Sequence, residues 1–372
     1  MIEIPPNLDQ IELTLFGLGY GESAVVHLGE NRWIVVDSCL DTNTGKPAVL
    51  EYFDRIGVSA HEAVRLIVVS HWHDDHVRGL SNIVLSCPNT PVCCSSALTQ
   101  SEFLSYILDY GKIMTQTELS GVSEIKRTLQ ILRSRRPIKR ALANRVILNL
   151  PAEGNAESCV VTTLSPSDKE YDIFIRGILD LMPQARQTKK RAPYLRPNHA
   201  AVALWIETGT VKILLGSDLE EKGDPSTGWS AIVQFAERPQ GRASIYKVPH
   251  HGSSTGHHDK VWSDIMAQLP IAVLSPFYHA GKKVPTIKDM ERIVTFAPES
   301  YITTRDSIPK SKKRYASSVE RTIRESVGKI RTVQPQMGWV RLRNAGKFNP
   351  HRWDVKLSPT GSRLSALIEA RR

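Results

Sequence analysis

The sequence predicts an α/β fold in which strands and helices alternate through two similar halves. Two observations lead to this prediction. Short apolar runs rich in β-branched residues recur along the chain, and two of them, 66–70 and 211–216, lead into a histidine and an aspartate. Segments with the apolar spacing of a helix lie between such runs, as at 285–295. With 372 residues, of which 41% are hydrophobic and 23% charged, the chain has the composition of a globular protein.

The individual elements follow from the local pattern in chain order. Residues 11–37 are predicted to form two strands around a glycine-rich turn, and 95–145 a mostly helical, basic insert. Further strands are expected at 66–70, 145–150, 158–164, 201–207, 211–216, 243–248, 271–275 and 338–343. Further helices are expected at 47–60, 171–182, 228–237, 259–268, 285–295 and 316–327. Residues 1–345 are predicted as one domain, and 346–372 as a basic, poorly ordered tail.

The segment from His71 to His76 is the most informative in the chain. It has the sequence HWHDDH and directly follows the predicted strand 66–70. Imidazole nitrogens and carboxylate oxygens are ligands that Zn²⁺ and Mn²⁺ accept. His71 and His73 are two residues apart on extended chain, so both can reach one ion, while Asp75 and His76 point toward a second. Side chains placed just after a strand are held by a rigid element, and the segment therefore predicts a metal site.

A strand followed by HxHxDH resembles the metallo-β-lactamase superfamily. Three more pieces occur in that family's order: a strand ending at Asp37, a strand ending at Asp218, and a strand ending at the pair His250 and His251. The resemblance implies a metallo-β-lactamase αββα sandwich, here with a helical insertion and a basic C-terminal extension. It also implies a hydrolytic metal site.

The sequence is most similar to the metallo-β-lactamase-like domain of ComEC-type DNA-uptake proteins and to free-standing relatives of that domain. GLGYGES at 17–23 resembles the group's DVGQGDS turn, with Gly17 in place of the first aspartate. NHAAVAL at 198–204 resembles its NxxSxVL strand start, and KVPHHGSS at 247–254 resembles its last motif. The likeness extends over residues 11–305.

The chain departs from this group in two places. Val284-Pro285 stands where the group often has His-Pro, and the insert between Asn82 and Ala156 has no recognised counterpart. His279 lies where the post-motif loop of the relatives approaches the site, and we consider it a substitute for their missing histidine.

The resemblance implies two divalent metal ions, Zn²⁺ or Mn²⁺, and assigns ligands to the first of them. His71 and His73 bind this ion, with a third ligand from Asn198 or His199. His199 is the only histidine in its stretch and is assigned the role, with Asn198 as the alternative. Asp218 is expected to bridge the two ions.

The second ion is assigned Asp75, His76 and one of the adjacent histidines His250 and His251. His250 is taken as the ligand, and His251 as a further ligand or a supporting residue. Asp37 is expected to hold a ligand or a loop by hydrogen bonds rather than to bind metal. Asp75 is also expected to orient the activated water.

The net charge of +10 favours polyanionic partners, nucleic acid first. The basic residues are clustered, and clusters of this kind bind phosphate backbones in a salt-sensitive way without reading sequence. The cluster residues we associate with nucleic acid are Arg133, Arg135, Arg136, Lys139 and Arg140, then Lys189, Lys190 and Arg191, then Lys312, Lys313 and Arg314.

The cysteines, the first residues and the length of the apolar runs indicate where the protein is located. Five cysteines without regular spacing do not form a disulfide framework. The first residues, MIEIPPNLDQ, lack the basic and apolar regions of a signal peptide, and no apolar run reaches membrane-spanning length. We expect a cytoplasmic protein without membrane contact.

Two metal ions suit phosphodiester cleavage, because they generate a hydroxide nucleophile and stabilise the charge that grows on the phosphoryl oxygens. Together with the basic clusters, this predicts a metal-dependent nuclease or phosphodiesterase in which Asp75 and Asp218 are catalytic. Whether the substrate is DNA or RNA stays open. The resemblance also implies protein partners, since free-standing relatives serve as effectors in multi-subunit antiviral systems.

Two alternatives remain. The same site can polarise the carbonyl group of a small ester, lactone or thioester, because a fold does not choose its substrate. The chain could instead be an interaction subunit, in which the metal is structural and the basic faces hold nucleic acid for a partner enzyme.

Overall fold

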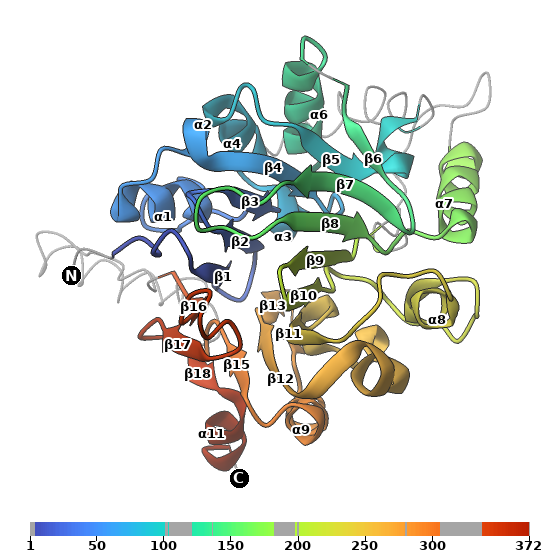
Figure 1. Ribbon diagram of the computed structural model, residues 1–372. Helices are drawn as coiled ribbons and strands as arrows, with labels where there is room; N and C mark the ends of the chain where they lie inside the picture. The colour runs from blue at the N-terminus through green and yellow to red at the C-terminus, as the bar shows by residue number, and fades with distance from the viewer. Residues whose placement is uncertain are drawn as a thin grey trace, which may run out of the picture.

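Two mixed sheets face each other, and helices cover their outer surfaces (Figure 1). The structure is a computed structural model that describes residues 4–100, 103, 121–135, 137–181, 198, 201–279, 281–305 and 337–371. Within these residues each of the two sheets has eight strands. This layering confirms the αββα sandwich that the sequence predicted.

The first sheet contains the N-terminal strands and one C-terminal hairpin. In the order of pairing, its strands are β17 (Trp353–Leu357), β16 (Trp339–Asn344), β1 (Ile11–Gly17), β2 (Glu22–Leu28), β3 (Trp33–Val36), β4 (Val64–Val69), β5 (Val92–Ser95) and β6 (Lys139–Ala141). Pairing is antiparallel from β17 to β3 and parallel from β3 to β6.

The second sheet is arranged in a similar way. In the order of pairing, its strands are β18 (Ser362–Arg363), β15 (Ser300–Ile302), β12 (Met266–Leu274), β11 (Ala243–Lys247), β10 (Val211–Leu215), β9 (Leu204–Thr208), β8 (Cys159–Thr163) and β7 (Arg145–Leu150). The strands β10, β11, β12 and β15 are parallel. A separate two-stranded hairpin consists of β13 (Phe277–His279) and β14 (Lys282–Val284).

The helices of the described residues lie between these strands in sequence. They are α1 (Ala48–Ile56), α2 (Ala60–Ala63), α3 (Asp74–Val77), α4 (Leu80–Ser86), α6 (Gly121–Leu132), α7 (Asp168–Leu181), α8 (Gly228–Gln234), α9 (Ile287–Phe296) and α11 (Leu364–Glu369). Short single turns occupy Ser96–Thr99, His250–Gly252, Ser254–Gly256 and Val261–Ile265. No helix of the described ranges is both long and apolar enough to cross a membrane.

Three apolar layers hold the sandwich together. Ile34 and Val68 of the first sheet and Ile213 of the second are fully buried between the sheets. A second layer packs α1, α4 and α6 on the outer face of the first sheet, and a third packs α8, α9 and α11 on the second sheet. Each fully buried aliphatic side chain contributes about 1.5–3 kcal/mol, so these layers fix the strand ends rigidly.

The residues of the expected tail belong to the folded domain, which corrects the prediction for 346–372. β17 pairs with β16 and β18 pairs with β15, so this segment adds a strand to each sheet. Leu364, Leu367 and Ile368 of α11 are buried in the outer core of the second sheet. Charged residues stand between the apolar positions of β17 in the sequence, so the short alternating pattern of a strand was not recognised there.

Two further predicted segments differ from the structure, and a third lies outside the described residues. The expected helix 259–268 is a single turn at Val261–Ile265, after which β12 begins at Met266, because pairing with β11 and β15 outweighs local helix propensity. The insert at 95–145 contains α6 and also β6, while 101–102, 104–120 and 136 lie outside the described residues. The expected helix 316–327 also lies outside them.

Candidate metal centre

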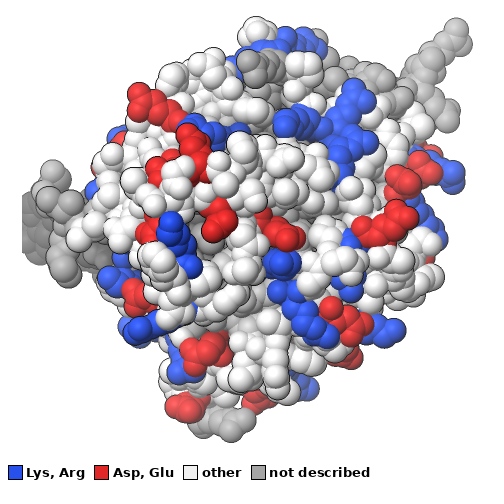
Figure 2. Space-filling model, in the orientation of Figure 1, with Lys and Arg blue, Asp and Glu red and all other residues white. Residues whose placement is uncertain are grey.

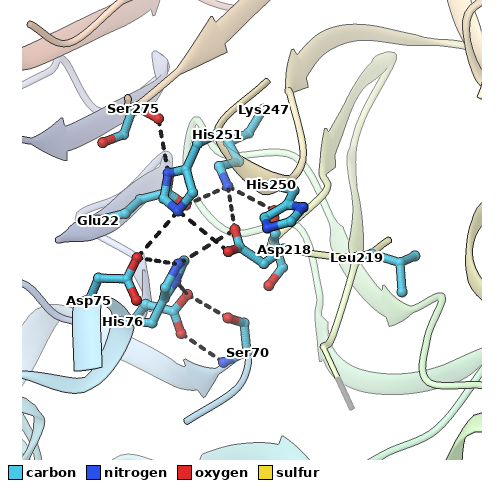
Figure 3. A network of polar contacts seen from close by, with 12 residues as sticks. Glu22, Ser70, Asp75, His76, Asp218, Leu219, Lys247, His250, His251 and Ser275 are labelled. Atoms are coloured by element: carbon cyan, nitrogen blue, oxygen red, sulfur yellow. Dashed lines mark hydrogen bonds and ion pairs between the residues drawn. The ribbon is translucent and has the colours of Figure 1, made fainter. Parts of the chain in front are cut away.

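The candidate ligands follow strands of both sheets at the edge where those strands end. Asp37 follows β3 and His71 follows β4, and these two strands are parallel. Asp218 follows β10, and His251 follows β11 on the facing sheet. Because parallel strands bring their carboxyl ends to one edge, the two sheets deliver these side chains to a common point. Figure 3 shows Asp218 and His251 of the second sheet facing Asp75 and His76 of the first.

One group of ligand atoms consists of His71, His73 and Asp218, whose atoms all lie within 4.8 Å of one another. His71 Nε2 lies 3.1 Å from His73 Nδ1 and 3.9 Å from Asp218 Oδ2. Two ring nitrogens and a carboxylate oxygen that converge in this way form a set suited to one divalent ion.

A second group consists of Asp75, His76 and His251, again within 4.8 Å. His251 Nε2 lies 3.3 Å from Asp75 Oδ2, and His76 Nε2 lies 3.8 Å from the same oxygen. Asp218 touches this group too, since its Oδ1 is 3.5 Å from His76 Nε2 and its Oδ2 is 3.4 Å from His251 Nε2. Asp218 therefore lies between the two groups, as a bridging carboxylate does.

Asp37 also lies within 4.8 Å of ring nitrogens of His71 and His76, and hydrogen bonds occupy its carboxylate. Its carboxylate accepts a hydrogen bond from His76 Nδ1 at 2.8 Å and another from Ser70 Oγ at 2.6 Å. Because Ser70 gives its hydrogen to Asp37, its oxygen accepts from His71 Nδ1, 3.0 Å away. In their neutral, metal-binding form both histidines then carry their lone pair on Nε2, which faces the cluster.

His251 is oriented by the backbone. Its Nδ1 donates to the carbonyl oxygen of Ser275 at 3.0 Å, so its Nε2 also carries the lone pair. His76 Nε2, His251 Nε2 and Asp218 Oδ1 are buried and form no hydrogen bond. Buried polar atoms without hydrogen-bond partners are costly unless an ion satisfies them, so this donor set fits divalent metal.

Backbone strain gathers around the same atoms. Four residues of this region have positive φ values that residues other than glycine rarely adopt. The values are 60° at Asp37, 47° at Ser217, 47° at His250 and 54° at His251. Such conformations cost on the order of 1–3 kcal/mol each and occur mainly at functional sites, where the surrounding structure enforces them.

The electrostatics divide the four histidines into two pairs. Burial lowers the pKa of His71 well below its ordinary value and also lowers the pKa of His73. Burial opposes charge on His76 and His251 as well, but nearby Asp218 and Asp75 outweigh it. These carboxylates raise the pKa of His76 well above its ordinary value and the pKa of His251 to about 10.

These shifts predict how the stability of the metal-free protein depends on pH. The contribution of His76 and His251 is complete below the ordinary histidine pKa of about 6.5, and it is lost as the pH rises toward the folded pKa. The contribution of His71 and His73 is complete above that pH and is lost as the pH falls below it. We therefore expect the melting temperature in chelator to peak at about pH 6.5.

Melting curves between pH 4 and pH 10 would check this prediction. His251→Gln should flatten the alkaline side of the peak, since it removes one of the two groups with a raised pKa. A melting temperature that rises steadily through that range would show that the histidine pairs do not have these opposite charge states.

A buried ion pair that sequence reasoning missed lies behind the cluster. Lys247 Nζ contacts Glu22 Oε1, and both side chains are almost fully buried. Lys247 also donates to the carbonyl oxygen of Ser217 at 2.9 Å and lies 4.0 Å from Asp218 Oδ1. Glu22 belongs to the glycine-rich turn whose resemblance was noted, and that turn was the signal that could have assigned it.

We expect the pair to hold the loop of Asp218 in place. Lys247→Met removes the cation at Glu22 Oε1 and leaves His251, 3.8 Å from Oε2, as the remaining one, which should lower the free energy of unfolding by about 3 kcal/mol. Glu22→Gln combined with Lys247→Met should recover much of this loss, because no charge is then left buried alone. Urea unfolding of the metal-free single and double variants measures both changes in the free energy of unfolding. A double variant no more stable than Lys247→Met would argue against the pair.

The cluster opens into a cleft of about 620 Å³. Its lining includes Asp75, Asp218 and His251 at the metal groups and Tyr20 and Lys282 elsewhere. The walls are polar as well as aromatic.

Of the two adjacent histidines, the structure brings His251 into the cluster, whereas the sequence favoured His250. His250 Nδ1 lies 2.6 Å from Thr255 Oγ1, and its Nε2 lies 3.4 Å from Asn198 Nδ2, so both ring nitrogens already have partners. Its side chain is 25% exposed and lines the cleft. The pair occupies consecutive left-handed positions, which turns the second ring inward.

The other predicted ligands are placed as follows. Asn198 lines the cleft, where its Nδ2 contacts Glu220 and His250, and its Oδ1 is buried without a hydrogen bond. His199 lies outside the described residues. His279 is exposed at the rim of the cleft, where its ring packs 4.4 Å from that of Tyr20.

The basic residues of the insert serve two purposes. Arg135 donates to the carbonyl oxygen of Val84 at 2.7 Å, and Lys139 donates to that of Ile147, so both tie chain segments together. Arg133 and Arg140 are exposed. Lysine and arginine side chains gather over the region of β6 and β7 in Figure 2. The remaining predicted contacts, Arg136, Lys189, Lys190, Arg191, Lys312, Lys313 and Arg314, lie outside the described residues.

Comparison with known proteins gives only distant likenesses. No family model matches the chain, and no curated protein matches it. Among solved structures, the chain is similar to MEM-A1, a subclass B3 metallo-β-lactamase from a soil metagenome library, at 13% identity and a TM-score of 0.35 over 67% of this chain and 80% of that one.

Two further structures show likeness of the same kind. The metallo-β-lactamase fold protein YhfI from Bacillus subtilis aligns at 14% identity and a TM-score of 0.38, over 80% of this chain and 97% of that one. Zn²⁺-bound PqqB from Methylobacterium extorquens aligns at 12% identity and a TM-score of 0.29, over 61% of this chain and 56% of that one. Similarity at this level carries no information on substrate, so the function must be argued from the side chains of the cluster.

Proposed function

We propose that this chain is a metal-dependent hydrolase of phosphodiester bonds, with nucleic acid as its substrate. The observation that carries the proposal is the pair of ligand groups around Asp218, of which His73, Asp75, Asp218 and His251 line the cleft. Two groups around one carboxylate match the ligand pattern of a two-metal site, and the histidine and carboxylate donors suit Zn²⁺ or Mn²⁺.

Bound divalent ions would supply Lewis acidity toward the phosphoryl oxygens and would activate water near neutral pH. The protein contributes orientation. Asp37 and Ser70 hold His76 and His71 with their Nε2 atoms inward, and the carbonyl oxygen of Ser275 does the same for His251. Asp75 Oδ2, close to His251 and facing the cleft, is placed to accept a proton from attacking water.

Charge supports a phosphodiester over a neutral ester. The chain carries a net charge of +10, and the ions of a two-metal site would offset the four carboxylates that line the cleft beside Lys282, those of Asp74, Asp75, Asp218 and Glu220. Exposed Arg133 and Arg140 add cations on the first sheet's side of the molecule. A polyanion gains from such a surface through counterion release, whereas a lactone or thioester gains nothing.

A substrate panel tests the proposal. Metal-depleted protein would receive Zn²⁺ or Mn²⁺ and then labelled single-stranded and double-stranded DNA, RNA, a small chromogenic phosphodiester, and a matched carboxylic ester, lactone and thioester. We expect cleavage of the phosphodiesters and little of the carbonyl compounds. Faster turnover of a lactone or thioester would instead favour the small-ester alternative.

Binding without cleavage in every metal would favour an interaction subunit. A salt series adds a second criterion, because the affinity for nucleic acid should fall with a log–log slope of roughly 0.7–0.9 for each neutralised phosphate.

A further inference from the structure

The β13–β14 hairpin forms one wall of the cleft at the metal cluster. Phe277 pairs with Val284, and His279 pairs with Lys282. Directly opposed residues of an antiparallel pair project to the same face of a hairpin, and all four of these residues line the cleft. The hairpin therefore presents two rings and a cation to the space where a substrate of the cluster would lie.

The glycine-rich turn between β1 and β2 holds the other face of the hairpin. Tyr278 alternates with the residues that line the cleft, and its backbone N–H donates to the carbonyl oxygen of Gly19. Gly19 has a φ of 94°, and a Cβ atom at this position would lie 2.5 Å from the Tyr278 ring. Only glycine fits there without displacing the ring. The same turn carries Tyr20, so this packing fixes Tyr20 beside the hairpin.

Four rings form a row from the metal cluster to the rim of the cleft. Between ring centres, Phe277 lies 5.3 Å from the candidate ligand His251 and 5.7 Å from Tyr20. The Tyr20 ring lies 4.4 Å from that of His279. His279 is exposed, and Tyr20 and Phe277 are partly exposed. The row therefore offers ring surface to a ligand beside the atoms that are proposed to hold metal.

The cation of this wall has no counter-charge among the described residues. Lys282 is exposed and forms no ion pair with any of them. The cleft carboxylates outside the two metal groups already have partners, since Asp74 lies 3.7 Å from Arg78 and Glu220 accepts from Asn198 Nδ2 at 2.9 Å. An anionic group bound next to the metal ions therefore finds Lys282 available.

A nucleotide with an unpaired base matches this wall. Its phosphate suits the metal ions, and the attached base is a flat ring system that aromatic side chains bind by stacking. The acyl chain of a lactone or thioester has neither a ring to stack nor a charge for Lys282. In a duplex each base is paired and stacked on its neighbours, so it reaches such a wall only by leaving the helix.

We propose that this aromatic row is a base subsite. The base next to the scissile phosphate of a single strand stacks against His279 and its neighbours in the row, while Lys282 binds the adjoining phosphate. The inference rests on the proposed function, because it names the form of nucleic acid that the metal cleft accepts. It gives a preference for unpaired bases without sequence reading, since every base has a face that can stack.

Substrates that differ only in one base test the subsite. A dinucleoside phosphodiester would be compared, in Zn²⁺ or Mn²⁺, with counterparts that lack the base on the 5′ side, on the 3′ side or on both. We expect the loss of one particular base to lower kcat/KM by roughly 5- to 150-fold, the usual effect of losing one stacked base. The loss of the other base should have little effect.

The ratio of kcat/KM between the intact and the fully abasic substrate separates stacking from a structural role. His279→Leu should lower this ratio at least threefold, whereas His279→Trp should keep it, because a larger ring still stacks. His61→Leu makes the same substitution at an exposed histidine outside the cleft and should leave the ratio as in wild type. A structural defect would lower kcat/KM for both substrates together and leave the ratio unchanged.

Two adjacent lysines of β14 provide a matched pair for the phosphate contact. Lys283 lies directly opposite Tyr278 and does not line the cleft. Binding of labelled single-stranded DNA would be measured in chelator across a salt series. Lys282→Met should lower the salt slope by about 0.7, the contribution of one phosphate, and Lys283→Met should leave the slope unchanged.

The outcomes distinguish this inference from the proposed function. Equal kcat/KM for intact and abasic substrates, a ratio that His279→Leu does not change, or a duplex cleaved as fast as a single strand would overturn the base subsite alone. No cleavage of any phosphodiester would overturn the proposed function. Binding in chelator then still tests the subsite, which predicts that a fully abasic strand binds at least fivefold more weakly than an intact one. Equal binding of the two strands would overturn the subsite as well.

Discussion

Asp218→Asn is expected to reduce phosphodiester cleavage by roughly 10³-fold or more while the fold remains intact. Asp218 is 2% exposed and places one oxygen near His76 and the other near His71 and His251. An amide at this position loses the negative charge and replaces one acceptor oxygen with a donor group. The two ligand groups could then no longer share this side chain, and the negative charge that compensates two cations would be lost.

Cleavage of the small phosphodiester, metal content and melting temperature would be measured together on this variant. Asp224→Asn provides the matched control, because Asp224 is a partly exposed aspartate whose side chain pairs with Lys169 and accepts from the backbone of Ser226. The control should keep wild-type turnover. Near-normal turnover in Asp218→Asn would remove this residue from the reaction.

The second large effect distinguishes the adjacent histidines. His251→Gln is expected to abolish cleavage and reduce metal content, because His251 Nε2 lies in the cluster, within 3.4 Å of carboxylate oxygens from both Asp75 and Asp218. His250→Gln is expected to keep metal content and to change turnover less than tenfold, because both nitrogens of His250 contact Thr255 and Asn198 instead.

The two variants serve as each other's control, since they make the same substitution one residue apart. Elemental analysis and steady-state cleavage rates would be measured for both. The opposite result, with metal lost in His250→Gln and retained in His251→Gln, would require a different arrangement of the loop after β11.

The resemblance implied the αββα sandwich, and the sequence indicated most of the cluster because its signals are local. His71, His73, Asp75 and His76 lie within six residues, and the strand before them has a clear apolar pattern. Asp37 and Asp218 also directly follow apolar strands. A residue that ends a buried strand is placed by that strand, so its position can be inferred without the rest of the fold.

The choice between His250 and His251 could not be made in this way. Which ring turns inward depends on the left-handed φ values of both residues, and those values depend on packing around the loop. For Asp37 the sequence predicted a hydrogen-bonding role, which its bonds to His76 and Ser70 match. The further contact from Ser70 to His71 joins residues on neighbouring strands and leaves no trace in spacing.

The ion pair of Glu22 and Lys247 and the hairpin of β16 and β17 depend on contacts between distant parts of the chain. Glu22 and Lys247 belong to different sheets, and a lysine within a strand usually reaches solvent. The C-terminal strands have charged residues at alternate positions, a pattern that suggests an exposed tail until β1 is known to provide an edge.

The measurement that most directly tests a shared two-metal centre is a titration of metal-free protein with Zn²⁺ or Mn²⁺, in which bound ions per chain and the cleavage rate of labelled single-stranded DNA are followed together. We expect no cleavage in chelator, and a rate that saturates when two ions are bound. Cleavage that persists in chelator, or protein that binds two ions and hydrolyses no phosphodiester, would contradict the proposed function.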